Sequence, residues 1–562
     1  MILFGDPSFR QNLRRLVDEA LMPLDCSASG ANSLDDVRSL LIRFGQIEQA
    51  AEDATGEVAS ATLQMLRDRT DALARLLVAA IHSGTDRVPA QNLRHIASGL
   101  READLPNPTV TVKVPEGFAF YSLFPEQYVA AAERWAGERE QGGDRHVLVV
   151  GIRSIGTTLS AVVAQALIAR GWHARRLTVR PSGHPFDRRV QLDPGSLRGA
   201  AHALVVDEGP GASGSSMASA ARVLVESGLS RERIAFLPGH DGEPGAHASD
   251  EVRRWWSEIP RYSVPLDQVR WNGRSLVDRL GESAQQILAS SSAVDRIEDL
   301  SAGRWPSILS VPGGARVFPL FERAKYRCVL RDGRAMLWKF DGLISRSPSP
   351  TDSPETSRQP IGRLLGFVGF PWIEGTPLTA ADANPRIIAQ IGGYIRKCAG
   401  PSLSPHEQES GFDRLAEMLY WNTRESLGEG VANLARQLSE KARAWVGAEP
   451  SRGYGDGRLS PWEWIRTPDG RIVKVDAEGH DADHTIIGKQ PMLWDAAGAI
   501  VEWGMDQPAQ DLLLRSAGLE AIPSAWLELH RLAYAAFRLG MSSMCQVDGS
   551  FYREQLARLV RQ

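Results

Sequence analysis

The fold is decided by residues 146–240, where apolar segments alternate with helical ones. The segments are HVLVVGI (146–152), LSAVVAQALIARG (159–171), HARRLTVRP (173–181), ALVVDEG (203–209), MASAARVLVESG (217–228) and RIAFLPGH (233–240). Continuous apolar runs such as HVLVVGI are typical of strands that are buried on both faces of a parallel sheet. Strands that alternate with helices form right-handed βαβ units. We therefore predict an α/β domain whose ligands sit at the carboxyl ends of parallel strands.

Two adjacent carboxylates, Asp207 and Glu208, end the third of these strands, and a Gly/Ser loop (209–216) and a helix follow. The N-terminus of a helix attracts a phosphate through its exposed N–H groups and its dipole. Gly211 and Gly214 let the backbone approach a ligand closely, while carboxylates accept hydrogen bonds from sugar hydroxyls. The pattern predicts a site for a phosphorylated sugar. The alternative is a strand-end acidic pair that caps the next helix.

This segment resembles the signature of type I phosphoribosyltransferases, although its loop is one residue longer than the commonest form and serine replaces the usual threonine. The resemblance implies that the two acids hold the ribose hydroxyls, that residues 212–216 hold the 5-phosphate, and that the turn 151–156 takes the pyrophosphate of phosphoribosyl pyrophosphate (PRPP). The expected catalytic residues are Asp207, Glu208 and Arg153. The expected substrate-binding residues are Gly151, Ser154, Gly156, Thr157, Thr158, Gly211, Ala212, Ser213, Gly214, Ser215 and Ser216.

Between the two turns lies RLTVRPSGHPFDRRVQL (176–192), a Pro/Gly segment in which Arg180, His184 and Arg188 cluster. The same family often carries a mobile hood here, and cations on such a hood would neutralise pyrophosphate and exclude water. We therefore add these three residues to the predicted substrate site. The alternative is a solvated basic loop. His240 and His247 follow the fourth strand, where they face either the same pocket or solvent.

The flanking regions differ from this α/β segment. Residues 8–100 show apolar positions at helical spacing, and TVTVKV (109–114) alternates like a strand. Downstream, RCVLRDGRAMLWKF (327–340) predicts a β-hairpin turned at Asp332–Gly333, SRSPSPTDSPETSRQP (345–360) a loop, and LLGFVGF (364–370) a strand. We expect a helical N-terminal region (1–105), a phosphoribosyltransferase-like α/β domain (106–300), and an α+β domain with terminal helices (305–562).

The last region more faintly resembles the aminoglycoside-phosphotransferase branch of the kinase-like fold. Lys339 occupies the strand position of the lysine that pairs with ATP phosphates, and YGDGRLSPWEWIRTPDGRIVKVDAEGH (454–480) resembles the catalytic block. The resemblance implies a catalytic Asp456, a metal-binding Asp476, and an Asp495 that braces the loop. Tyr454 replaces the usual histidine. The usual metal-binding asparagine is absent, and Glu463 is the nearest match, so Glu463 and Asp476 are the expected ligands of Mg²⁺.

A second metal hypothesis arises from a cluster of acids and histidines within nine residues, Asp476, His480, Asp481, Asp483 and His484. Such a mixture of ligands suits a transition metal that supports hydrolysis. The alternative is a solvated polar loop, because no second cluster elsewhere completes such a site.

Composition narrows the functional classes. The chain of 562 residues has a net charge of −4, which excludes a general basic field for nucleic acid. It contains no apolar run long enough for a membrane span, and its start does not read as a secretory signal. Four separated cysteines fit a reducing, cytoplasmic location. The helical N-terminal region suits a homo-oligomer.

These observations lead to two functional hypotheses. In the first, the chain is a glycosyltransferase of the phosphoribosyltransferase type. It would use PRPP and Mg²⁺ to transfer or remove a nucleobase-like acceptor, and the fused kinase-like domain would bind ATP as a second phosphotransferase. The expected chemistry is displacement at the anomeric carbon through an oxocarbenium-like state. In the second, the protein is a non-catalytic nucleotide- or PRPP-binding regulator with a pseudokinase-like scaffold.

Overall fold

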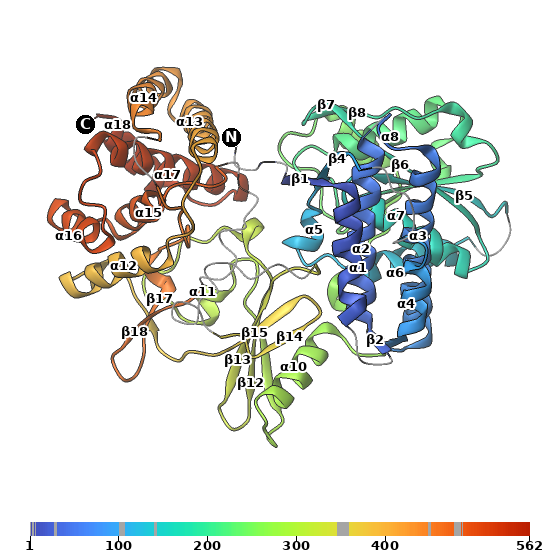
Figure 1. Cartoon of the computed structure of the whole chain (residues 1–562), viewed down its shortest axis with the longest axis horizontal. Helices are drawn as coiled ribbons and strands as arrows, with labels where there is room; N and C mark the ends of the chain where they lie inside the picture. The colour runs from blue at the N-terminus through green and yellow to red at the C-terminus, as the bar shows by residue number, and fades with distance from the viewer. Residues whose placement is uncertain are drawn as a thin grey trace.

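A computed structural model describes the chain except residues 1, 3, 4, 6, 27–30, 55, 101–106, 140–142, 345–358, 448–450, 477–484, 486 and 562. Figure 1 shows two bulky halves that are bridged at the bottom by an antiparallel sheet. The first half combines the N-terminal helices with a parallel sheet, and the second consists mostly of C-terminal helices. The mixed α/β character predicted from the sequence is confirmed.

The parallel sheet has the strand order β10 (Ile234–Leu237), β9 (His202–Val206), β5 (His146–Ile152), β6 (His173–Val179). Its strands are the four apolar runs that the sequence marks. Alternate residues of β5 and β9 enter two different cores, because successive side chains point to opposite faces. Helices α6 (Pro125–Gly137) and α7 (Ile155–Ala169) cover one face, and α8 (Ser215–Glu226) and α9 (Asp250–Glu258) cover the other.

The N-terminal region packs directly onto this half as α1 (Leu13–Cys26), α2 (Leu34–Asp53), α3 (Ser60–Ser83) and α4 (Ala90–Ala97). Helix α2 starts at a capping box, in which Ser33 and Asp36 satisfy each other's backbone amides. Helices α2 and α3 both lie against α7. The predicted strand is β4 (Thr109–Lys113), and it pairs antiparallel with β1 (Ser8–Asn12), which the sequence analysis placed at the start of a helical region.

The bridging sheet is antiparallel, in the order β11 (Val294–Asp299), β12 (Lys325–Leu330), β13 (Ala335–Phe340), β15 (Phe367–Pro371), β14 (Gly362–Leu364). The predicted hairpin of β12 and β13 is confirmed, with Gly333 in the left-handed region. The prediction that 364–370 forms one strand is wrong. Leu365 and Gly366 have φ values of 50° and 74°, so the chain reverses there and forms two strands.

The second half surrounds α17 (Ser524–Cys545) with helices and one small sheet. The helices are α12 (Pro385–Cys398), α13 (Pro405–Leu427), α14 (Glu429–Ala442), α15 (Leu493–Trp503), α16 (Gln507–Ala517) and α18 (Ser550–Arg561). The sheet contains β16 (Thr376–Pro377), β17 (Trp464–Arg466) and β18 (Ile472–Lys474). Helix α10 (Leu276–Ile287) connects the two halves and packs on the bridging sheet through Trp338, whose indole N–H donates to the carbonyl oxygen of Leu280.

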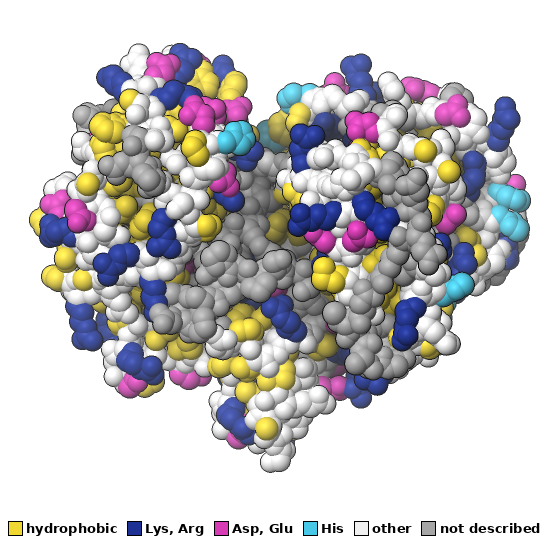
Figure 2. All heavy atoms as spheres, in the orientation of Figure 1, with side chains coloured by type: hydrophobic (Ala, Val, Ile, Leu, Met, Phe, Trp, Pro, Cys, Tyr) yellow, Lys and Arg dark blue, Asp and Glu magenta, His cyan; other side chains and the backbone are white. Residues whose placement is uncertain are grey.

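Basic and acidic side chains are interspersed over the face shown in Figure 2, without a continuous patch of one sign. Within the described part of the chain, no helix combines the length and the apolar character needed to cross a bilayer.

Candidate functional site

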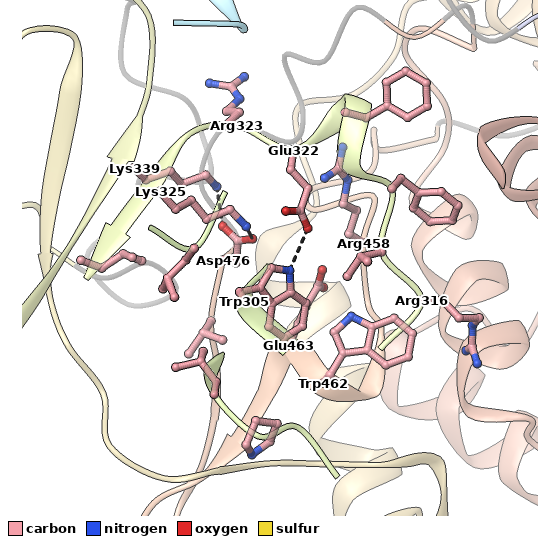
Figure 3. Close-up of a pocket in the computed structure, with 18 of the residues that line it drawn as sticks. Trp305, Arg316, Glu322, Arg323, Lys325, Lys339, Arg458, Trp462, Glu463 and Asp476 are labelled. Carbon is pink, nitrogen blue, oxygen red and sulfur yellow. Dashed lines mark hydrogen bonds and ion pairs between the residues drawn. The ribbon is translucent and has the colours of Figure 1, made fainter. Parts of the chain in front are cut away.

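A cavity opens between the bridging sheet and the C-terminal helices, and two lysines and one carboxylate meet at one end of it (Figure 3). Lys325 on β12 and Lys339 on β13 are directly opposite each other across the two strands. The Nζ atom of Lys339 lies 2.6 Å from Oδ1 of Asp476, and that of Lys325 lies 3.0 Å from Oδ2. Two ammonium groups thus share one carboxylate at the wall of the cavity.

Lys325 keeps its positive charge in the folded protein although its side chain is largely buried. Burial alone would lower the pKa of Lys325, but the charges of Asp476 and Glu322 outweigh burial and raise it above its ordinary value. Lys325 therefore stays charged. The sequence analysis did not single out Lys325, although it contained a signal. Like charges directly opposite in a hairpin are destabilising unless an acid lies between them or an anion binds.

Behind this end of the cavity, a buried lysine joins two of the predicted acids. The Nζ atom of Lys474 on β18 lies 3.0 Å from Oδ2 of Asp456 and 3.3 Å from Oε2 of Glu463. The side chains of Lys474 and Asp456 are only 2% and 1% exposed. Burial opposes the charge on Lys474, but the two carboxylates outweigh it and raise the pKa of this lysine. Tyr394 also donates its hydroxyl to Asp456, at 2.7 Å.

Asp495, at the start of α15, holds the loop that carries Asp456. Its carboxylate accepts hydrogen bonds from the backbone amides of Gly455, Asp456 and Gly457, at 2.9, 3.2 and 2.6 Å. Burial, reinforced by the neighbouring charge of Asp456, raises the pKa of Asp495 to about 6 despite these three donors. Asp495 thus fixes the backbone of residues 455–457, in the position that the kinase resemblance implied for a bracing aspartate.

Glu463 and Asp476 line the same cavity, and both carboxylates suit a hard cation. Burial raises the pKa of Glu463, and the nearby charges of Asp456 and Asp476 add to this increase, although Lys474 opposes it. Its Oε2 atom accepts no hydrogen bond and has the ammonium of Lys474 at 3.3 Å as its ion-pair partner. A divalent ion would relieve this repulsion, so the two residues fit Mg²⁺ with nucleotide phosphates as further ligands. No group of three or more potential metal ligands occurs among the described residues. His480, Asp481, Asp483 and His484 lie outside them.

The other end of the cavity is aromatic and rich in arginine (Figure 3). Trp305 donates its indole N–H to Glu322 at 2.8 Å, which holds the ring against the cavity. Trp462 and Arg316 lie beyond it, and Arg458 lies between this end and the lysines. The sequence analysis did not single out these residues. Arg458 and Trp462 lie within the block 454–480 beside Asp456 and Glu463, whereas Trp305 and Arg316 come from a distant segment.

In the α/β half, helix α2 contacts the arginines that were predicted to bind pyrophosphate. The Nε atom of Arg153 lies 2.9 Å from Oε2 of Glu52, and its Nη1 atom lies 3.0 Å from Oδ1 of Asp53. Arg180 forms an ion pair with the same Asp53 and donates to the carbonyl oxygen of Arg153. Arg176, which is on β6, also pairs with an acid of α2, because its Nη1 atom lies 2.7 Å from Oε1 of Glu48.

The turn after β5 is packed closely by other parts of the protein. A side chain added at Gly151 would overlap the carbonyl group of Gly156, and one added at Gly156 would lie 2.8 Å from the carbonyl oxygen of Val206. Ser154 has a φ of 129°, a strained region for a residue with a side chain. Thr157 and Thr158 are buried, and Gly45 of α2 lies directly on Thr158.

The Gly/Ser loop after Glu208 is covered by a hairpin formed by β7 (Ser182–His184) and β8 (Asp187–Arg189). Ser213 and Ser215 donate their hydroxyls to the carbonyl oxygen of Pro185 in this hairpin, at 3.2 and 3.3 Å. Other loop residues make backbone contacts or contribute to α8. Gly211 and Ala212 accept from the amides of Gly245 and His247, Gly214 precedes α8, and Ser216 lies in its first turn. His184 and Arg188 are on the hairpin and make contacts within it.

Asp207 and Glu208 lie at the end of β9. Oε2 of Glu208 accepts from the amide of Gly117 at 3.1 Å, and the amide of Glu208 donates to Oδ1 of Asp207 at 2.8 Å. Burial raises the pKa of Asp207 to about 7, and burial with the charges of Glu116 and Asp207 raises that of Glu208 to about 8. His240 lies beside the following residue, Gly209, and burial lowers the pKa of this histidine.

No family model matches the sequence, and no curated protein does. Among solved structures, similarity extends to a choline kinase from Streptococcus pneumoniae, at 12% identity and a TM-score of 0.34, over 50% of this chain and 98% of that one. An ethanolamine kinase from Plasmodium vivax matches at 10% identity and 0.30, over 42% and 79%. A macrolide 2'-phosphotransferase from Brachybacterium faecium matches at 13% identity and 0.29, over 50% and 97%.

The prediction of a glycosyltransferase as the main activity is wrong. The similar solved structures are phosphotransferases, and they cover about half of the chain. The local geometry gives the physical reason. The arginines expected to hold pyrophosphate are neutralised by helix α2, and the serine hydroxyls expected to hold a phosphate donate to Pro185 instead.

Proposed function

We propose that the C-terminal half binds a magnesium nucleotide in the cavity and transfers a phosphoryl group to a hydroxyl of a small molecule. The observation that supports this proposal is the sharing of Asp476 between Lys325 and Lys339, at 3.0 and 2.6 Å. A bound magnesium polyphosphate would replace these ion pairs by new ones, so that no charge is left without a partner. The lysines would turn to phosphate oxygens, and the carboxylate would turn to the metal ion.

Each residue of the site has a role in this proposal. Lys325 and Lys339 orient the phosphates, and Glu463 and Asp476 hold Mg²⁺, which would supply charge neutralisation of the transferred group. Asp495 keeps the loop at 455–457 in place. Asp456 accepts the proton of the attacking hydroxyl, which requires Lys474 to move away from it. Phosphoryl transfer depends mainly on such positioning and electrostatics.

A second candidate function is binding of a nucleotide without turnover. It is favoured by the buried pair of Lys474 and Asp456, in which the expected proton acceptor is already neutralised at 3.0 Å. In this case the cavity would act as a nucleotide sensor. The two candidates differ in turnover and not in binding.

Calorimetric titration with the non-hydrolysable analogue Mg–AMPPNP tests the proposal. Asp476→Ala and Lys339→Met should each weaken binding about 100-fold, because each removes a charge-assisted contact to the phosphates or the metal. Asp469→Ala is the matched control, since Asp469 is an exposed carboxylate in the turn between β17 and β18. Unchanged affinity in Asp476→Ala, with its fold intact by circular dichroism, would refute the nucleotide site.

Turnover then separates the two candidates. Wild-type protein is incubated with ATP, Mg²⁺ and a panel of small alcohols, and phosphorylated products are detected by mass spectrometry. Product formation that is lost in Asp456→Asn supports the phosphotransferase. Tight Mg–AMPPNP binding without any product supports the sensor.

A further inference from the structure

The cavity is lined by more cationic than acidic side chains. Among the described residues, six cationic and three acidic side chains line it. Lys325 and Lys339 are at the end next to Asp476, and Arg316 is on the side of the C-terminal helices (Figure 3). Arg458 lies between them, close enough for its charge to act on Lys325, and Trp462 lies next to Trp305. The proposed nucleotide site uses the lysine end, so Arg316 and Arg458 face the part of the cavity left for the second substrate.

Arg316 shares one carboxylate with Arg538, a further arginine that lines the cavity. Arg316 lies 2.7 Å from Oε2 of Glu502, and Arg538 lies 3.3 Å from Oε1. Glu502 is fully buried, and its other hydrogen bonds come from the neutral hydroxyls of Tyr534 and Tyr552. Although burial alone would raise the pKa of Glu502, Arg538 and Arg316 outweigh it and lower the pKa, so the carboxylate is ionised. One negative charge thus balances two guanidinium groups, and one positive charge remains.

The acids that line the cavity already have partners. Glu322 accepts from the indole of Trp305 and from the amide of Gly303, both at 2.8 Å. Asp476 is held by two lysines, and Glu463 lies 3.3 Å from Lys474. A cationic second substrate would have to compete with these contacts, whereas an anionic one would meet the two guanidinium groups that share Glu502.

Aromatic rings hold the arginines in place. The guanidinium of Arg316 lies 3.8 Å from the ring centroid of Phe551 and 4.9 Å from that of Trp462. That of Arg538 lies 4.4 Å from the ring centroid of Phe318. Stacking fixes the plane of a guanidinium. Arg316 donates from Nε to Tyr552 and from Nη2 to Glu502, and Arg538 donates from Nε to Tyr552 and from Nη1 to the sulfur of Met541. The remaining N–H groups of each fork are the ones that an oxyanion would contact. Arg458 is positioned by its own backbone amide, which donates to Oδ1 of Asp456 at 3.3 Å.

From this geometry we propose that the phosphoryl acceptor is an alcohol with a flat apolar body and an oxyanion, either a carboxylate or a phosphate. The oxyanion contacts Arg458 and the guanidinium groups of Arg316 and Arg538, and the flat body lies against Trp305 and Trp462. This inference rests on the proposed phosphotransferase function and names the substrate class of the same cavity. The hydroxyl points toward the nucleotide end.

Four matched probes test the inference by calorimetry on the wild-type protein saturated with Mg–AMPPNP. They are 4-(hydroxymethyl)benzoate, 4-(hydroxymethyl)phenyl phosphate, 4-(hydroxymethyl)benzamide and 4-(hydroxymethyl)benzylamine, which share one ring and one alcohol and differ in charge. At least one of the two anionic probes should bind about 10-fold more tightly than the amide, and the amine should bind most weakly. The tighter of the two anions identifies the oxyanion.

Arg458→Gln should reduce the ratio of anion to amide affinity to near one. Arg471→Gln is the matched control, because Arg471 is an exposed arginine in the turn between β17 and β18, and it should keep the wild-type ratio. Equal binding of anions and amide, tighter binding of the amine, or no binding of any probe up to about 10 mM would overturn the inference. If Mg–AMPPNP itself does not bind, the proposed function also fails. If Mg–AMPPNP binds, only the acceptor class is refuted.

Discussion

The end of the parallel sheet and the cavity under the bridging sheet contain similar residue types but use them differently. In both places carboxylates follow a strand and cations lie on neighbouring segments. At the parallel sheet, Glu52 and Asp53 of helix α2 hold Arg153 and Arg180, and Glu52 also pairs with Arg67. In the cavity, Lys325 and Lys339 share Asp476 at the wall of an open space.

This difference shows why a local motif is weak evidence for a ligand site. The Gly/Ser loop contains the residues of a phosphate cradle, but its serine hydroxyls donate to Pro185 and its backbone is covered by other loops. Binding of an anion requires donors and positive charge that the chain itself leaves uncompensated. In the cavity, two lysines share one carboxylate and line an open space, although the sequence there matches the kinase-like pattern less well.

The largest expected effect comes from breaking the buried pair in the kinase-like site. Lys474→Met leaves Asp456 and Glu463 buried without their compensating charge, and should lower the free energy of unfolding by about 3–5 kcal/mol. Urea denaturation followed by circular dichroism measures this change.

Two variants check the cause. Lys489→Met removes an exposed lysine that lies 2.8 Å from Glu407, and should cost less than about 1 kcal/mol because exposed ion pairs contribute little. Combining Lys474→Met with Asp456→Asn should recover part of the loss, since one buried charge is then removed. Equal effects of the Lys474 and Lys489 variants would show that Lys474 is not buried as a charge partner.

Much of the fold could be predicted because it depends on local hydrophobic patterns. Strands β5, β6, β9 and β10 are continuous apolar runs, and the turn between β12 and β13 carries an Asp–Gly pair. The reversal at Leu365 was missed because apolar residues flank it on both sides, so the pattern shows no polar break.

The candidate site could be predicted only in part. Lys339, Asp456, Glu463 and Asp476 lie in local patterns, and the structure brings Lys339 next to Asp476 and Glu463 near Asp456. The partners that decide whether a charge is available come from distant segments. Asp53 is 100 residues away from Arg153, and no periodicity or motif connects the two.

An intermediate effect is expected where α2 closes the turn after β5. A Cβ atom at Gly45 would overlap the hydroxyl of Thr158, so Gly45→Ala should destabilise the protein by about 1–3 kcal/mol through overpacking. Gly393 in α12 is the matched control, because open space surrounds the position of its Cβ atom. Gly393→Ala should stabilise by about 0.5–1 kcal/mol through helix propensity. Thermal denaturation of both variants measures the difference in their stabilities. A Gly45→Ala variant that is as stable as wild type would contradict close packing of α2 on α7.

The last prediction concerns the pH dependence of stability. In the folded protein the pKa of Asp207 is about 7 and that of Glu208 about 8, whereas unfolded carboxyl groups titrate near about 4. Between these values the folded state binds more protons than the unfolded state, so the free energy of unfolding falls as pH rises from about 4 to about 8. Combined Asp207→Asn and Glu208→Gln substitutions remove both titrations.

The double variant keeps an acceptor oxygen for the amides of Gly117 and Glu208, so its fold should be unchanged at low pH. At pH 8 it should be more stable than wild type by several kcal/mol, because it has no buried carboxylate to ionise and each pKa unit corresponds to about 1.4 kcal/mol. Urea denaturation at pH 5.5 and pH 8 measures the difference between the two slopes. Wild-type stability that rises over this interval, or equal slopes in the two proteins, would mean that the acids at the end of β9 are solvated in the folded state. Asp207 and Glu208 would then resemble the acids that line the open cavity, instead of being enclosed by the protein.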